Sequence, residues 1–298
     1  MKRTLLMLFI GTALTAVAQE EDDFFSDDSE PSKSYERAFS STRIINGHSS
    51  ETLEAGELEF RIEHRFGDVA GENGGAQAMF GFDNSTDIRF AFEYGLTDKM
   101  MIGLGRNKGA GNPYRSLVDG LYKYRFLSQG ENAPISMSVL GVAAFTYMTA
   151  SEEITDVSYF PKTAHRFAYA TQLNLTRTFD GKASLALMPT VVHRNYVASD
   201  DQNTLFAIGA AARVSVTKKI GVNLEYYHVM DDPNLRPDAM NSLSIAFDYS
   251  TFGHNFKIDI TNSRGFGETQ FVTGTVSDWM KGQFRIGFAI TRSFALKG

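Results

Sequence analysis

The sequence predicts an all-β fold, a transmembrane antiparallel up-and-down β-barrel of about 12 strands. Three features predict it. An export signal stands at the N-terminus, side chains alternate between apolar and polar at a period of two, and short and long connections follow one another along the chain. Helical spacing is nowhere sustained.

Residues 1–18 predict a secretory signal peptide. Lys2 and Arg3 give a basic start, an apolar stretch follows, and small residues precede the expected cleavage before Gln19. The stretch is shorter than the roughly 20 residues that a membrane helix needs. The chain has no cysteine, so disulfides cannot contribute to stability after export.

Residues 19–40 predict an acidic, flexible periplasmic lead, because their charge, Ser and Pro leave little surface to bury. Seven acidic residues lie between positions 20 and 30. Once these and the two signal-peptide cations are set aside, the net charge of −6 becomes −1 for residues 31–298. A nearly neutral body argues against nucleic-acid binding, which usually needs a basic face.

Residues 41–298 predict the barrel itself. Twelve runs alternate at a period of two and approach the nine to eleven residues of a tilted membrane strand. They span 57–66, 86–94, 98–106, 118–127, 134–147, 165–178, 182–194, 203–216, 219–229, 241–251, 255–262 and 283–294. Short turns alternate with longer loops, and an even strand count brings both chain ends to the periplasmic side.

A soluble β-sandwich or a lipocalin-like barrel is the alternative, because alternation alone says only that the two faces differ. The strands are longer than the five or six residues typical of globular sheets. Aromatic residues also gather at the strand ends, where interfacial girdles lie. These residues are Tyr94, Tyr114, Tyr147, Phe167, Tyr169, Phe179, Tyr196, Tyr226, Tyr227 and Tyr249.

Charged residues in the middle of strands predict a polar lumen, since a small dry core would not tolerate them unpaired. The candidate lumen-lining residues are Arg89, Glu93, Lys123, Arg125, Glu225, Asp248, Lys257, Asp259 and Arg285. Both signs are interspersed, which favours a narrow, ion-paired lumen over a pore selective for one charge.

Three blocks carry a resemblance to a known family: GELEFRIEHRFGD at 56–68, FGFDNSTDIRFAFEYGLTDKMMIGLGR at 80–106 and GETQFVTGTVSDWMKGQFRIGFAITRSF at 267–294. They resemble an uncharacterised, domain-of-unknown-function family of bacterial outer-membrane β-barrel proteins. The resemblance implies the fold and the location and supplies no reaction. Phe294 resembles the terminal aromatic residue that the assembly machinery recognises, although four residues follow it here. Trp279 is a candidate interfacial anchor.

No catalytic, cofactor or metal site is predicted, and we do not expect an enzyme. The six histidines lack ligand spacing, although His165, His193 and His228 lie near outer strand ends. Three aspartates in loop 230–240 lack the spacing of a calcium-binding EF-hand. A hydrolase built on His165 and Ser184 is a remote alternative without a supporting motif.

The leading functional hypothesis is passage or binding of a small solute through the charged, narrow lumen. The alternative is a non-conducting structural or assembly barrel whose acidic lead, residues 19–40, engages a periplasmic partner. In either case the expected partners are outer-membrane lipid and the barrel assembly machinery.

Overall fold

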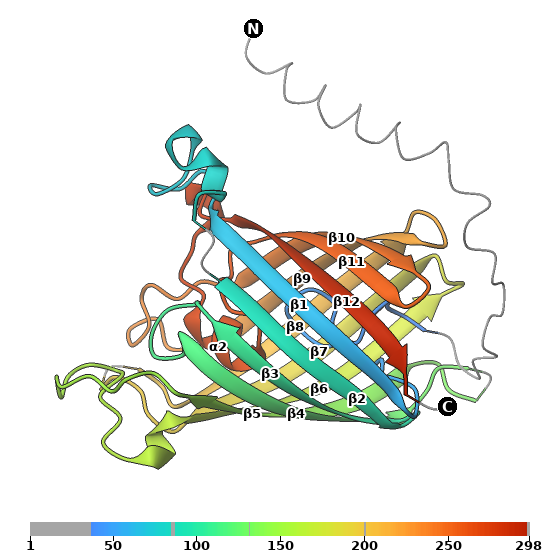
Figure 1. The fold of residues 1–298 in the computed structure, drawn as a ribbon, viewed down its shortest axis with the longest axis horizontal. Coiled ribbons are helices and arrows are strands. Elements are labelled where there is room, and N and C mark those ends of the chain that lie inside the picture. The colour runs from blue at the N-terminus through green and yellow to red at the C-terminus, as the bar shows by residue number, and fades with distance from the viewer. Residues whose placement is uncertain (1–36, 85–86, 131, 200, 297–298) are drawn as a thin grey trace, which may run out of the picture. The chain divides into compact units, whose positions relative to one another are not determined.

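The computed structural model describes residues 37–84, 87–130, 132–199 and 201–296, which form a closed antiparallel barrel of twelve strands (Figure 1). Each strand pairs with its sequence neighbours, and β12 pairs with β1 to close the sheet. The strands are β1 (Glu57–Asp68), β2 (Asp87–Thr97), β3 (Met100–Lys108), β4 (Ser116–Leu127), β5 (Ser136–Thr146), β6 (Phe167–Phe179), β7 (Ala183–Arg194), β8 (Thr204–Ser215), β9 (Ile220–Met230), β10 (Ser242–Thr251), β11 (His254–Thr261) and β12 (Arg285–Ala295). The predicted fold class and all twelve predicted strands are confirmed.

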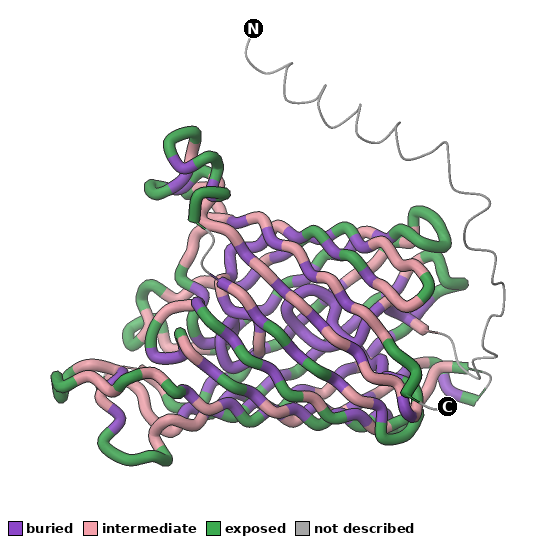
Figure 2. Tube along the Cα trace, in the orientation of Figure 1, coloured by how far each residue is buried: buried purple, intermediate pink, exposed green. Residues whose placement is uncertain are grey.

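Burial alternates along the strands, as the sequence pattern predicts (Figure 2). In β2, Arg89 and Glu93 are fully buried, whereas Phe92 between them is 54% exposed. Successive side chains of a strand point to opposite faces. The barrel therefore presents mostly apolar side chains outward and keeps most of the charged strand side chains inside.

The short turns lie at one end of the barrel and the long loops at the other, and we call these the turn end and the loop end (Figure 1). Glu57 pairs with Ala295, so the first strand begins and the last strand ends at the turn end. In the described residues, four short helices interrupt the loops: η1 (Ala76–Gly81), η2 (Thr163–Arg166), α2 (Glu268–Gly274) and η3 (Trp279–Lys281). Over the described ranges, no helix has the length and apolar character needed to span a membrane.

Residues 37–55 are not part of the wall, and we call this segment the plug (Figure 1). Most of it lies buried inside the barrel, whereas Glu54 near its C-terminal end is exposed. The plug is a hairpin in which Arg43 bridges to His48 and the Ile44 amide donates to the Gly47 carbonyl over 2.8 Å. Thr52 bonds the carbonyl of Asp98 in the β2–β3 turn, so the hairpin enters from the turn end. This segment was not predicted: positions 37–40 were assigned to the lead and 41–55 to the barrel. Residues 1–36, with the signal peptide and most of the lead, lie outside the described residues.

The long β11–β12 connection also enters the lumen, from the loop end. Residues 263–275, which we call the inward loop, carry helix α2, and its residues Glu268 to Thr273 are all buried. The helix faces β5, β6, β7 and β8, on the far side of the barrel from its own strands. The sequence predicts an outer loop at 263–282, between the last two strands, and about two thirds of that loop folds into the barrel.

The aromatic girdle is only partly as predicted. Tyr147, Tyr169 and Phe179 are about 40% exposed on the outer face. Tyr114 and Tyr227 are buried, so their assignment to the girdle is wrong. Tyr226 is exposed beside Tyr227, and because consecutive side chains of a strand point in opposite directions, both cannot face outward.

Candidate functional site: the plugged lumen

Lys123 of β4 holds the plug by its main chain. Its ammonium donates hydrogen bonds to the carbonyls of Thr42, Ser49 and Glu51 at 2.8, 3.1 and 2.9 Å. Lysine has three donors, and all three are used here. The side chain is fully buried, so its charge depends on these carbonyls in place of water.

The tip of the plug is held by charges of both signs. The Glu225 carboxylate of β9 accepts from the amides of Ile45, Asn46 and Gly47 at 3.1, 2.9 and 3.1 Å. Successive amides in a turn form a concave site for an anion. On the other side, Lys257 of β11 donates to the carbonyls of Arg43 and Ile44. The Asn46-Gly47 dipeptide is a turn signal in the sequence. Ile45 and Asn46 are the central residues of the observed turn, and neither Asn46 nor Gly47 has a positive φ, so this is not the type I′ turn that the dipeptide indicates.

Polar side chains add further contacts between the plug and the wall. Thr42 donates to Glu93 over 2.9 Å, and Asn46 donates to Ser244 of β10 over 2.8 Å. Glu51 lies 3.8 Å from the Arg125 guanidinium. Five predicted lumen-lining residues therefore meet around the plug: Glu93, Lys123, Arg125, Glu225 and Lys257.

The other four predicted lumen-lining residues pair elsewhere inside the barrel. Arg89 bonds Asp119 over 2.8 Å and Glu63 over 3.1 Å. Asp248 bonds Arg213 over 3.0 Å, Asp259 lies 3.7 Å from Arg65, and Arg285 bonds the Asn262 carbonyl over 2.7 Å and the Asp68 carboxylate.

Arg43 joins the plug to the inward loop. Its guanidinium donates to the Phe266 carbonyl over 2.6 Å and lies 3.9 Å from the Glu268 carboxylate. Both oxygens of Glu268 are buried without a hydrogen-bond partner in the described structure. Burial raises the pKa of Glu268, and Arg43 opposes that shift. The two segments that fill the lumen from opposite ends therefore contact each other.

Tyr227 of β9 packs between the two segments. Its ring meets that of Phe271 in the inward loop edge-on, with centroids 4.8 Å apart, and its hydroxyl bonds Gln172 over 3.0 Å. A Cβ atom on Gly47 would lie 1.9 Å from that hydroxyl oxygen. Glycine at the tip of the plug is therefore required by close approach.

His48 of the plug is fully buried, and neither ring nitrogen has a hydrogen-bond partner among the described residues. Burial, reinforced by Arg43 and Lys123, holds the pKa of His48 well below its ordinary value of 6.5. His48 is therefore neutral while the plug is docked.

The buried charges of the described residues nearly balance: nine are cationic and ten are anionic. A lumen selective for one sign of charge would show an excess of the other sign. Balanced charges within hydrogen-bonding distance form a structural network, because each ion's desolvation must be offset by a partner.

Part of this network, on β1, was not predicted from the sequence. Glu59, Arg61, Glu63 and Arg65 are all buried on its inner face, and Arg61 bonds Glu59 over 2.7 Å. The signal was present, since these four residues alternate at a period of two with Phe60, Ile62 and His64. The plug residues had no comparable signal apart from the Asn-Gly dipeptide.

The two remaining predicted residues lie at the barrel ends. Trp279 is half-buried, donates to the Leu243 carbonyl over 3.0 Å and stacks on Phe284. Phe294 is 43% exposed at the turn end, where the Arg292 guanidinium lies 5.4 Å from its ring centroid. Pairing continues beyond it, since the Leu296 amide donates to the Gly56 carbonyl over 2.9 Å.

The residues considered for a metal, calcium or hydrolase site do not form such a site among the described residues. His193 bonds Thr204 and His165 stacks on Tyr196, and no group of three or more metal-ligating side chains occurs in that part of the chain. Asp231 of loop 230–240 is paired with Arg236 over 2.8 Å. His165 precedes β6 at the loop end, whereas Ser184 pairs with Thr178 near the turn end, so they do not form a catalytic pair.

A family model described as a membrane bound beta barrel domain (DUF5777) matches residues 39–294. No curated protein matches the chain. Among solved structures, a KdgM porin in complex with disordered oligogalacturonate is 8% identical, with a TM-score of 0.47 over 80% of this chain and 99% of that one. An outer membrane channel from Pseudomonas putida F1 is 14% identical, with a TM-score of 0.46 over 82% and 98%. The outer membrane protein Omp33 of Acinetobacter baumannii is 10% identical, with a TM-score of 0.43 over 80% and 98%.

Proposed function

We propose that this chain, which belongs to the membrane bound beta barrel domain family (DUF5777), is an outer-membrane barrel that passes small polar solutes when its plug is displaced. The observation that carries the proposal is how the plug is held. Three charged side chains, Lys123, Glu225 and Lys257, bind its main chain. Water can take over each of these bonds, so displacement does not require a matching polar partner elsewhere.

The connectivity supports the same proposal. The covalent connection of the plug to the wall is at its C-terminal end, where Gly56 leads into β1 with a φ of 82°. It contributes no strand to the sheet, so it can leave the lumen without breaking a strand pair. The turn end faces the periplasm in this proposal, following the usual placement of short turns in outer-membrane barrels.

The solute class follows from the inner wall. With the plug displaced, the exposed surface carries both signs of charge and many hydroxyl groups, and water would fill it. Nearly balanced charges favour small polar or zwitterionic solutes over ions of one sign. The acidic residues at 20–30 precede the plug in sequence, so a periplasmic protein that binds them would act on the plug.

A non-conducting structural barrel is the second candidate, and one observation favours it. The plug and the inward loop fill the lumen from opposite ends, and Arg43 of the plug joins them by its hydrogen bond to the Phe266 carbonyl. In that case the interior network serves stability alone, and displacement of the plug has no physiological role.

Conductance of the refolded mature chain in planar bilayers separates the two candidates. We expect the mature chain to stay mostly closed, and deletion of residues 19–54 to open it. Deletion of residues 19–36 is the matched control and leaves the plug in place. A further variant, with residues 264–275 replaced by a short Gly-Ser linker, removes the second obstruction.

Passage would be ruled out by a barrel that folds, as heat-modifiable gel migration shows, and yet stays silent with both segments removed. A mature chain that conducts continuously would contradict the closed resting state. A chain that conducts only when the inward loop is removed would show that this loop, and not the plug, closes the lumen.

A further inference from the structure

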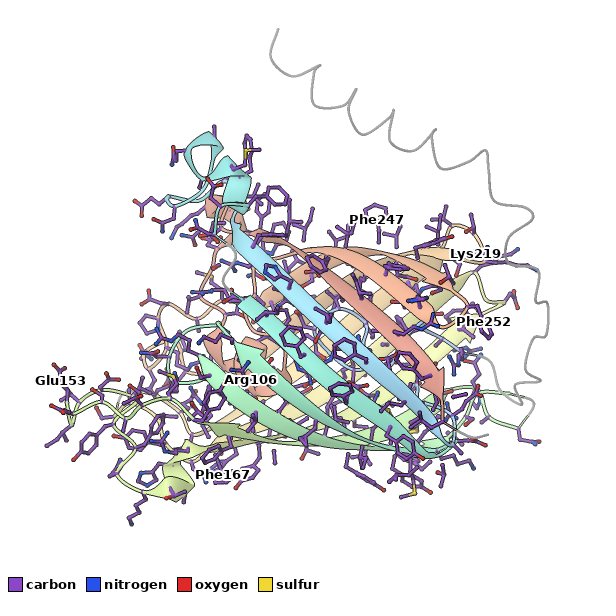
Figure 3. All side chains as sticks on the ribbon, in the orientation of Figure 1. Arg106, Glu153, Phe167, Lys219, Phe247 and Phe252 are labelled. Atoms are coloured by element: carbon purple, nitrogen blue, oxygen red, sulfur yellow. The ribbon has the colours of Figure 1, made fainter. Side chains whose placement is uncertain are left out.

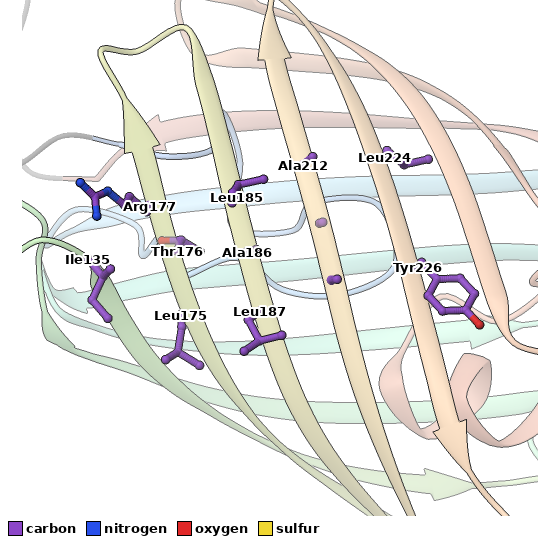
Figure 4. Close-up of a pocket in the computed structure, with 12 residues that line it drawn as sticks. Ile135, Leu175, Thr176, Arg177, Leu185, Ala186, Leu187, Ala212, Leu224 and Tyr226 are labelled. Carbon is purple, nitrogen blue, oxygen red and sulfur yellow. The ribbon is translucent and has the colours of Figure 1, made fainter.

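We infer that the outer wall of β6 to β9 carries a site for one anionic phospholipid, with an acyl chain in a groove and the phosphate on a basic rim. The groove has a volume of about 570 Å³ (Figure 4). That volume lies within the roughly 300–1,000 Å³ of pockets that hold small ligands. The site is separate from the lumen, so it does not depend on the proposed solute passage.

Two alanines form the floor of the groove. Ala210 and Ala212 face outward on β8, which is flanked by larger side chains on both neighbouring strands. Ala210 lies between Leu187 of β7 and Tyr226 of β9, and Ala212 lies between Leu185 and Leu224. Small side chains between rows of large ones leave a channel about one strand wide, which suits an extended hydrocarbon chain.

The groove runs toward a basic rim at the turn end. Arg177 of β6 pairs with Leu185 and lines the groove, where it is exposed (Figure 4). Lys182 in the β6–β7 turn and Lys218 and Lys219 in the β8–β9 turn are also exposed, and Lys219 marks the turn end in Figure 3. Asp180 is the acidic residue in these two turns.

The two basic turns are held side by side. The Ser215 amide at the end of β8 donates to the Lys182 carbonyl over 2.8 Å, and the next residues form the β8–β9 turn. Guanidinium and ammonium groups bind phosphate oxygens well. Cations clustered at the end of a membrane segment attract anionic headgroups, so the rim complements a phosphate at the level where an acyl chain in the groove would place it.

A phospholipid fits these features better than a second protein chain. The groove opens on the outward apolar face, where the surrounding medium is lipid, and an acyl chain is narrow enough for a channel floored by two alanines. A protein partner would need a wide complementary face. Selectivity for the anionic headgroup is what distinguishes this site from general contact with bulk lipid.

Native mass spectrometry of the mature chain, released from phosphatidylcholine nanodiscs that contain phosphatidylglycerol, tests the site. We expect wild type to retain phosphatidylglycerol in preference to phosphatidylcholine. Arg177→Gln should lower that preference about fivefold, the effect of one basic residue at a membrane surface. Arg106→Gln is the matched control, because Arg106 is an exposed arginine on β3 near the loop end.

Ala210→Leu tests the groove separately, because a leucine there should fill the floor and abolish retention of either lipid. Ala143→Leu is its control, since Ala143 is an outward-facing alanine on β5 away from the groove. Equal retention in the two leucine variants, or equal preference in the two glutamine variants, would overturn the site. A dimer of wild type that Ala210→Leu disrupts would show that the groove binds protein instead.

Discussion

The Arg43 guanidinium donates to the main-chain carbonyl of Phe266 over 2.6 Å, across 223 positions of sequence. Arg43 belongs to the plug, which enters from the turn end, and Phe266 belongs to the inward loop, which enters from the loop end. The bond is buried, so water does not compete for it in the closed barrel. It links the two closures of the lumen, and displacing either one must break it.

Replacing Arg43 by Met should weaken docking of the plug. Loss of a hydrogen bond to a charged group costs about 1.5–3 kcal/mol, which raises the undocked population about 10- to 150-fold. The chain has no cysteine, so the labelling rate of a single Ser49→Cys by a membrane-impermeant thiol reagent reports undocking. Arg37→Met is the control, because Arg37 is 32% exposed and lies 4.0 Å from Glu51 and 3.7 Å from Glu54, beyond hydrogen-bonding distance. Equal labelling in both variants would contradict the role given to Arg43.

Replacing Lys123 by Met should weaken docking more than replacing Lys257 by Met. The first change removes three hydrogen bonds to carbonyls of the plug, and the second removes two. The Thr42 carbonyl keeps the Ser49 amide as a donor over 3.0 Å, so each change leaves two carbonyls without a donor and the third lost bond sets the order. Each orphaned buried group costs about 1–3 kcal/mol. Lys219→Met, at an exposed turn, should leave the labelling rate unchanged. The reverse order of the two buried lysines would show that the main-chain bonds do not dominate.

Adding a methyl group to Gly47 should prevent docking, because the new Cβ would lie 1.9 Å from the Tyr227 hydroxyl oxygen. Tyr227→Leu should restore docking to Gly47→Ala by removing the obstacle. We expect a coupling energy of about 0.5–3 kcal/mol between the two positions in a double-mutant cycle of labelling rates. Gly267→Ala is the control, since a Cβ there has no neighbour within 4 Å. Additive effects of Gly47→Ala and Tyr227→Leu on the labelling rate would show that the added methyl group does not clash with Tyr227.

Docking of the plug should weaken in mild acid. The pKa of His48 is held well below 6.5 when docked, by burial and by Arg43, Lys123, Arg61 and Arg89, whereas undocked His48 has its ordinary pKa. The undocked plug therefore binds a proton that the docked plug does not. The free energy that neutral His48 contributes to docking is fully present above about pH 6.5 and is lost as the pH falls. The docking equilibrium constant decreases by at most about tenfold per pH unit.

The labelling rate of Ser49→Cys against pH measures this effect, and His48→Gln should flatten the rise below about pH 6.5. The contribution of Glu268 to docking has the opposite pH dependence, because the pKa of Glu268 is raised in the closed barrel. Its contribution is present at low pH and is lost as the pH rises through the raised pKa. Glu268→Gln should therefore leave the acid-side rise in place. A rise that survives His48→Gln would exclude His48 as its origin.

The wall of the barrel was predictable because strand formation and face assignment are local. Arg89 and Phe90 are neighbours in the chain, and a period of two sends one inward and the other outward whatever the remaining strands do. The same rule, applied strictly, would have placed Tyr226 and Tyr227 on opposite faces. It would also have assigned four residues of β1 to the inner face: Glu59, Arg61, Glu63 and Arg65.

What fills the barrel was not predictable in this way. Residues 37–55 are polar and aperiodic, which as a sequence is equally compatible with a solvated lead. They are ordered because Lys123, Glu225 and Lys257, from three strands far apart in the sequence, converge on their main chain. Main-chain carbonyls and amides are the same in every residue, so the plug sequence contains little that would reveal such contacts.

The sequence by itself determined a twelve-stranded barrel with a charged interior and an apolar exterior, because alternation, strand length and loop rhythm are properties of short segments. The tertiary structure decided that this interior is closed. Closure of the barrel brings Arg43 of the plug to Phe266 of the inward loop, and that meeting depends on long-range contacts that no local pattern encodes.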